Sequence, residues 1–113
     1  MSYWSEIEAG IAYLQQRTED MRKSGTEAAM ADATYRSIKA TAILEEKAKG
    51  TPATLCRDVI YARKDVQEAL LNRNCTQAVY EADREAINSM KLKLRITDAQ
   101  LARDWQASGE RGY

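Results

Sequence analysis

The sequence predicts an all-α fold, a helical hairpin or bundle with a short connector helix and a long C-terminal helix. Three observations predict it. Apolar residues recur at spacings of three and four along most of the 113 residues, as on one face of a helix. Only five Gly and one Pro interrupt the chain. No segment has a convincing β pattern. At this length we expect a single domain, residues 1–113.

Two helices are predicted in the first half, over residues 5–23 and 27–49. Ser5 followed by Glu8 has the form of a capping box, and the apolar residues after it share one helical face. Ser24-Gly25 is typical of a break between helices, and Thr26 can cap the second one. Tyr35 lies on the apolar stripe of that helix, so we expect it in the core.

A short connector helix is predicted over residues 52–61. Gly50 is the residue expected just past the end of the preceding helix. Thr51 is a good N-cap, and Pro52 suits the first helical position because its missing N–H would be unpaired there.

The last helix is predicted over residues 66–107, with a tail at 109–113. The stretch "NSMKLKLRIT" (88–97) alternates like a strand, but Met90 and Leu94 continue a helical stripe, so we expect a helix. The stripe averages 3.75 residues per turn, which predicts a nearly straight or faintly right-handed helix. Its members are Leu71, Cys75, Val79, Ala82, Ala86, Met90, Leu94, Thr97 and Leu101.

Self-association is predicted from the scarcity of bulky core residues. The chain has no Phe, and much of its 44% hydrophobic content is Ala. Leu92 and Ile96 place a second apolar flank on the last helix, which a second subunit could cover. We expect Trp4 and Trp105 to pack against a neighbouring helix or subunit. The predicted state is a homo-oligomer.

Composition excludes several classes of function. Lys and Arg number 17, as do Asp and Glu, so nothing indicates a general polyanion binder. The absence of His excludes Ser-His and Cys-His nucleophile pairs. We therefore expect no enzyme, catalytic residue, metal or cofactor. Cys56 and Cys75 are expected to be buried, inert thiols. No segment is apolar enough to span a bilayer, so we expect an intracellular, cytoplasmic protein without membrane contact.

An anion site is the main candidate, at the start of the connector helix. A helix N-terminus offers free N–H groups and the positive end of a dipole, while nearby hydroxyls, cations and a ring could bind a phosphorylated ligand. The alternative is an ordinary connector helix that Thr51 merely caps. The candidate residues are Thr51, Thr54, Arg57, Tyr61, Arg63 and Lys64.

A second candidate is a short polar row on the last helix. Arg84, Asn88, Lys91 and Arg95 follow one another at helical spacing and could meet nucleic-acid phosphates. Three cations give only a modest attraction, and such side chains usually just solubilise a helix. Nucleic acid is therefore not the favoured partner.

The segments "KGTPATL", "REAINSMKLKLR" and "LARDW", in this order, resemble small helical proteins encoded by tailed phages and prophages. The resemblance covers about residues 30–106. It implies an intracellular accessory protein without enzymatic activity. We expect one that sequesters or inhibits a host factor, either a host-defence protein or a phosphorylated nucleotide signal. The alternatives are a recombination or replication accessory that contacts DNA or a recombinase, and a structural or assembly component of the virion.

Overall fold

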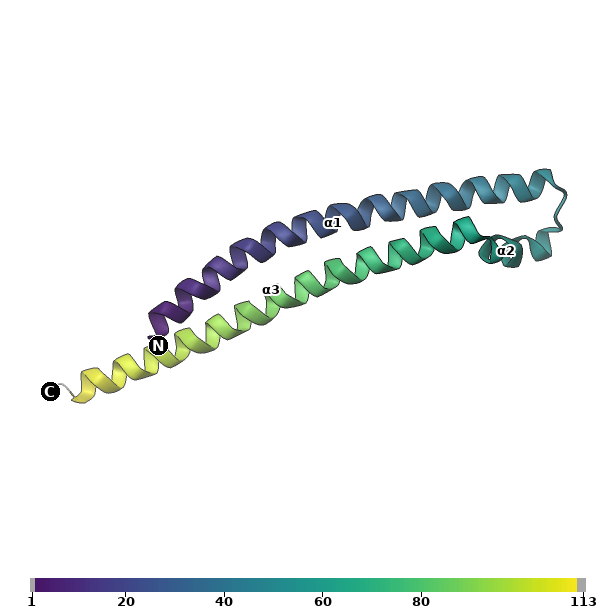
Figure 1. Cartoon of the computed structure of the whole chain (residues 1–113). Coiled ribbons are helices and arrows are strands. Elements are labelled where there is room, and N and C mark those ends of the chain that lie inside the picture. Colours follow the sequence, from purple (N-terminus) through teal and green to yellow (C-terminus); the bar gives the residue numbers. More distant parts are fainter. Residues whose placement is uncertain (1, 112–113) are drawn as a thin grey trace. The chain divides into compact units, whose positions relative to one another are not determined.

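The computed structural model describes residues 2–111, and the side chains of residues 2–108. It contains three helices: α1, Tyr3–Ala48; α2, Ala53–Ala62; and α3, Lys64–Arg111 (Figure 1). No strand occurs among the described residues. The all-α prediction, with a short connector and a long last helix, is confirmed. The segment 88–97 is helical, as predicted.

The predicted break at Ser24-Gly25 is wrong, because α1 runs through it as one helix of 46 residues. These two residues serve close packing instead. Ser24 is buried, and a Cβ added at Gly25 would lie 3.1 Å from Cε1 of Tyr80 on α3. Glycine therefore lets the two helices approach each other at a point where a larger residue would meet a ring.

The end of α3 also differs from the prediction. The helix begins at Lys64 and continues to Arg111, so Ser108-Gly109 does not stop it. Residues 109–111 of the expected tail are helical, and residues 112–113 lie outside the described part. A single glycine in a helix costs only ~1 kcal/mol relative to alanine, which is too little to end a helix by itself.

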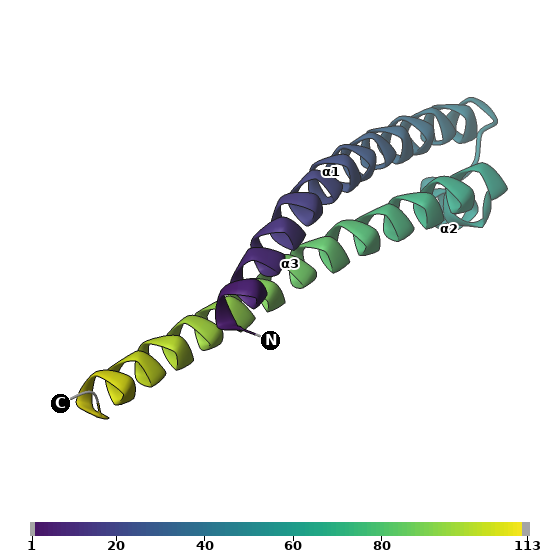
Figure 2. The same cartoon turned by 60° about the vertical axis from the view of Figure 1, so that its left-hand side comes forward.

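The chain divides into two compact units. We call Lys23–Glu81 the connector unit, and Met1–Arg22 with Ala82–Tyr113 the terminal unit. In each unit a segment of α1 packs antiparallel to a segment of α3 (Figure 2). In the connector unit, Gly25 meets Tyr80 while Asp32 pairs with Arg73. In the terminal unit, Gly10 meets Leu94 while Arg17 pairs with Asp83. The single domain expected from length stays a prediction.

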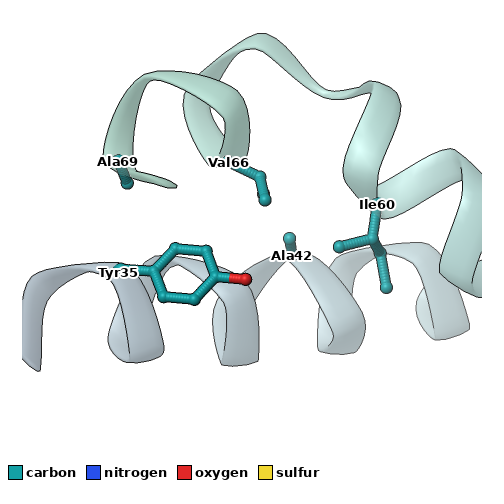
Figure 3. Close-up of a cluster of buried hydrophobic side chains, with 5 residues drawn as sticks. All are labelled: Tyr35, Ala42, Ile60, Val66 and Ala69. Carbon is teal, nitrogen blue, oxygen red and sulfur yellow. The ribbon is translucent and has the colours of Figure 1, made fainter. Parts of the chain in front are cut away.

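The core of the connector unit is built from all three helices. Tyr35 and Ala42 of α1 face Val66 and Ala69 of α3, and Ile60 of α2 closes the cluster (Figure 3). Tyr35 is thus in the core, as predicted from its place on the stripe. Alanines on α1 keep the helices close, so that the core is compact but contains few large side chains.

The turn after α1 fixes how the chain enters α2. Gly50 has φ +82°, a left-handed conformation that glycine adopts without strain. The Thr51 N–H donates to the Glu46 carbonyl and the Gly50 N–H to the Lys47 carbonyl, which together form a Schellman motif. The prediction of Gly50 as the residue past the helix end is confirmed.

The buried face of α3 differs from the predicted stripe in its first half. Leu71 and Val79 are 65% and 54% exposed, and Cys75 and Ala82 are exposed too. The positions that face α1 instead follow one another at alternating spacings of three and four residues, with a mean of 3.5 residues. They are Val66, Ala69, Arg73, Thr76 and Tyr80 in the connector unit, and Asp83, Ile87, Met90, Leu94, Thr97 and Leu101 in the terminal unit.

Polar side chains explain this error. Arg73 and Asp83 occupy inward positions because each has an opposite charge across the helix pair. Arg73 Nε lies 3.1 Å from Asp32 Oδ1, and Asp83 Oδ1 lies 3.5 Å from Arg17 Nη1. A mean spacing of 3.5 is that of heptad packing, not of the straight helix that the apolar pattern alone predicted.

Candidate functional site

Thr51 is not the N-cap of α2. The cap residue is Pro52, whose carbonyl accepts from the N–H groups of Leu55 and Cys56. Thr51 Oγ1 donates instead to Glu46 Oε2 at 2.9 Å, which ties the turn back to the end of α1. This hydrogen bond is the main reason that the pKa of Glu46 is lowered. The capping role predicted for Thr51 is therefore wrong, and its hydroxyl is already engaged.

Arg63 and Lys64 also have partners within the chain. Arg63 lies between α2 and α3, where its guanidinium pairs with Glu45 at 2.7 Å and Asp65 at 3.0 Å. It also lies 3.5 Å from Glu46. These carboxylates raise the pKa of Arg63, with the hydrogen bond to Asp65 contributing most. Lys64 is exposed and faces Glu68 at 3.9 Å. Neither cation lines the hollow beside Arg57 and Tyr61, and Thr54 is exposed.

Arg57 and Tyr61 belong to a stack of alternating cations and rings. On α2, the Arg57 guanidinium lies 5.9 Å from the centre of the Tyr61 ring. On α1, Lys39 Nζ lies 5.2 Å from that ring and 5.9 Å from the Tyr35 ring. Arg73 of α3 lies 5.3 Å from the other ring, that of Tyr35. Each helix thus places one cation against a tyrosine of the connector unit, an arrangement that orders the long basic side chains.

The centre of this stack is a hydrogen bond from Lys39 Nζ to Tyr61 Oη, at 2.9 Å. It raises the pKa of Lys39 and is the largest cause of the lowered pKa of Tyr61. Burial raises the pKa of Tyr35. The charge of Arg57 acts against this rise in the pKa of Lys39, but its contribution is the smallest of the causes. At neutral pH the stack is therefore cationic, and its charges repel.

An open hollow of about 360 Å³ lies beside Lys39 and Arg57. Its volume is within the range of sites that hold small ligands. The lining contains two cations, one phenol, one thiol and two aliphatic side chains, and no carboxylate: Lys39, Ile43, Cys56, Arg57, Ile60 and Tyr61. No ion pair involves Lys39 or Arg57 among the side chains of residues 2–108. The hollow can therefore accept an anion on one side and a flat apolar group on the other.

The two thiols differ from the prediction of burial. Cys75 is exposed, and Cys56 is only partly buried at the lining of the hollow. The exposed position of Cys75 follows from the 3.5-residue spacing of inward positions, which places Thr76 rather than Cys75 against α1.

The row Arg84, Asn88, Lys91 and Arg95 is exposed along its whole length on α3 in the terminal unit. Its three cations have no ion pair among the described side chains, whereas Arg17, Arg36 and Arg73 all do. Within the same part of the chain, no group of acidic or thiol side chains is suited to a metal ion.

Comparison with protein-family models, with curated proteins and with solved structures gives no match. Among the described residues, none of the helices combines the length and apolar character needed to cross a membrane.

Lys39 is the charged residue of the hollow that the predicted anion site did not include. It had a signal in the sequence. Tyr35 and Lys39 are four residues apart, as are Arg57 and Tyr61, so each helix carries one cation–tyrosine pair on a single face. Two such pairs on neighbouring helices of a hairpin are placed to face each other.

Proposed function

We propose that the chain is a non-enzymatic binding protein that sequesters a phosphorylated, aromatic small molecule, of the nucleotide class, in the hollow of the connector unit. The observation that carries the proposal is the pairing of Lys39 with Arg57 in one hollow without a carboxylate. Two neighbouring cations that repel each other are stabilised by an anion that contacts both.

The two cations of the hollow support the proposal that the ligand carries a phosphate. Lys39 and Arg57 supply N–H donors, and Arg57 can hold two phosphate oxygens at once. Hydrogen bonds to charged groups contribute ~1.5–3 kcal/mol each, so two such contacts contribute ~3–6 of the ~8 kcal/mol that micromolar binding requires, and contacts to a ring of the ligand supply the rest.

The rest of the lining supports an aromatic ring. Tyr61 offers a ring face, and Ile43 and Ile60 offer apolar contacts beside it. A nucleobase has the flat shape and the mixed polarity that such a surface favours. Because Thr51, Arg63 and Lys64 are engaged elsewhere, they are not part of the proposed site.

The resemblance to tailed-phage proteins supports a host cell as the source of the ligand, and removal of a host signal as the consequence of binding. A role as a virion component has no specific support in the geometry. A role in contact with DNA would involve the cationic row of the terminal unit, not this hollow.

Self-association is part of the proposal. Among the described residues, more large apolar side chains are exposed than buried. The exposed ones outside the tryptophans include Met30, Leu44, Leu55, Leu71, Leu92 and Ile96. Contact between copies would remove some of this surface from water, at ~25 cal/mol per Å².

Titration calorimetry with mononucleotides and dinucleotides tests the proposal. At least one nucleotide should bind in the micromolar range, more tightly than its nucleoside or inorganic phosphate alone. Lys39→Met and Arg57→Met should each weaken binding about tenfold or more, given the energy of charged hydrogen bonds. Light scattering on the same samples should give a mass above the 12.8 kDa of one chain.

Lys47→Met is the matched control, since Lys47 is an exposed lysine of α1 outside the hollow. It should leave the affinity unchanged. Binding that is absent for all nucleotides, or equally sensitive to Lys47 and Lys39, would contradict the proposed site. A mass of one chain at all concentrations would contradict self-association alone.

A further inference from the structure

The polar row on α3 is longer in the structure than in the sequence prediction. In the terminal unit, the exposed positions after Arg95 continue on the same face through Asp98 and Ala102 to Trp105. The spacings alternate between four and three from Arg84 onward. Over these 21 residue steps the face extends ~32 Å, at 1.5 Å per residue.

The two ends of this face have different chemistry. Arg84, Lys91 and Arg95 form a cationic end with Asn88 between them, and none of the three cations has an ion pair among the described side chains. Elsewhere on the chain, most arginines pair with a carboxylate. Free, regularly spaced cations are suited to phosphates that repeat along a chain.

The other end is aromatic. Trp105 is 78% exposed and Trp4 of α1 is 64% exposed. Both line one open groove of the terminal unit, about 630 Å³ in volume, together with Asp98, Leu101, Ala102, Arg103 and Gln106. Exposed tryptophans are costly in water, and two that share a groove offer ring faces to a flat partner.

We propose that the face from Arg84 to Trp105, with Trp4, is a binding track for single-stranded nucleic acid. Phosphates contact the cationic end, and bases stack on the tryptophans of the groove. Asp98 repels phosphate, so backbone contacts end at Arg95 and stacking begins beyond it. A duplex does not fit this division, because its bases are stacked inside and cannot reach the rings.

The charge of the face argues for this partner over an anionic membrane. Only two of its seven positions, Ala102 and Trp105, are apolar, whereas a helix that lies in a bilayer interface buries a continuous apolar face. The track is independent of the proposed ligand hollow, since it shares no residue with it.

Fluorescence anisotropy with labelled oligo-dT and oligo-U, against a DNA duplex of equal length, tests the track. Single strands should bind and the duplex should bind more weakly. The logarithm of the binding constant should fall with the logarithm of the salt concentration at a slope of about −2. This value follows from three cations, each of which contributes about −0.7 per phosphate contact. Arg84→Ala, Lys91→Ala and Arg95→Ala should each reduce that slope by about 0.7.

Trp105→Ala separates stacking from charge. It should weaken single-strand binding by at least about fivefold, the lower end expected for a stacked base, while the salt slope stays unchanged. Fluorescence of the two tryptophans, the only ones in the chain, should be quenched on binding. Lys64→Ala and Leu92→Ala are controls, an exposed cation and an exposed apolar residue outside the track, and should have no effect.

Several results would overturn the proposal. Equal affinity for duplex and single strand with no effect of Trp105→Ala would indicate general attraction to polyanions. Binding to vesicles of anionic lipid at the same salt, without binding to oligonucleotides, would assign the face to a membrane. Tryptophan fluorescence that changes only with protein concentration would assign it to a second copy of the chain.

Discussion

The connector unit and the terminal unit are built from the same two helices but differ in what they bury. In the connector unit, α2 adds a third helix, so Tyr35, Ile60 and Val66 are buried together. In the terminal unit only α1 and α3 pack, and Ile87 is the one large apolar side chain that is buried among those the structure describes there. Two helices bury few large side chains between them, whereas a third helix covers one more side of the core.

This difference teaches where each kind of binding can arise. A third helix creates a concave surface where it meets its neighbours. In the connector unit, the cation-lined hollow lies where α2 meets α1. A helix pair offers long open faces instead, and the terminal unit exposes its tryptophans and its unpaired cations there. The contrast is between a concave hollow, for which we propose a small ligand, and an extended surface, for which we propose a chain-like one.

The largest expected effect comes from opening the core of the connector unit. Ile60→Ala should lower the free energy of unfolding by ~2–5 kcal/mol, because Ile60 is 3% exposed and its loss leaves a cavity. Urea denaturation followed by circular dichroism measures it. The matched control is Leu55→Ala on the same helix. Leu55 is 53% exposed, so its effect should stay within ~0.5 kcal/mol.

If the free energy of unfolding falls equally in both variants, α2 does not close a core, and the two units do not differ in what they bury. Amide hydrogen exchange sharpens the comparison. The loss of protection in Ile60→Ala should be larger for residues of the connector unit than for residues 3–22.

A smaller effect is expected from acid, acting on the turn of the connector unit. The Thr51 hydroxyl lowers the pKa of Glu46, and Arg63 lowers the pKa of Asp65. A lowered pKa in the folded state stabilises the protein above the unfolded values of 4.5 and 3.8. That stability should be lost as the pH falls below about 4.5 and through the folded pKa values.

Thr51→Val tests the origin of this acid sensitivity. This change removes the hydroxyl that donates a hydrogen bond to Glu46. The variant should therefore be less stable than the parent at pH 7, and its stability should fall by less on acidification. Urea midpoints at pH 7, 5 and 3 measure both. Equal losses in parent and variant would show that the Thr51–Glu46 hydrogen bond does not contribute.

Much of the fold could be predicted from sequence, because helical periodicity and the Gly50-Thr51-Pro52 punctuation are local signals. The continuity of α1 could not. Taken alone, Ser24-Gly25 predicts the end of a helix. The role of Gly25 becomes clear only from its contact with the ring of Tyr80, which lies 55 positions later in the chain. The inward face of α3 was misassigned for a similar reason, since Arg73 and Asp83 are inward only because Asp32 and Arg17 are opposite.

Part of the lining of the candidate hollow could be predicted from the sequence. Arg57 and Tyr61 were expected at the connector helix, but as part of a site around its N-terminus. In the structure Arg57 lies in the middle of α2 and Tyr61 in its last turn, where Tyr61 accepts a hydrogen bond from Lys39. Thr51 and Arg63 were assigned to a ligand because the sequence does not show which carboxylates lie nearby. Glu45 and Glu46 come from the preceding helix and engage both residues.

The central claim is that the hollow beside Lys39 and Arg57 is where a nucleotide binds. Its most direct test is the alkylation of Cys56, whose thiol lines the hollow, in a Cys75→Ser background. We predict that a nucleotide found by calorimetry slows the reaction of Cys56 with iodoacetamide severalfold, and that Lys39→Met removes this protection. Exposed Cys75, followed in Cys56→Ser, should react at the same rate throughout. If the nucleotide binds while Cys56 reacts at an unchanged rate, the ligand lies elsewhere and the account of the hollow is wrong.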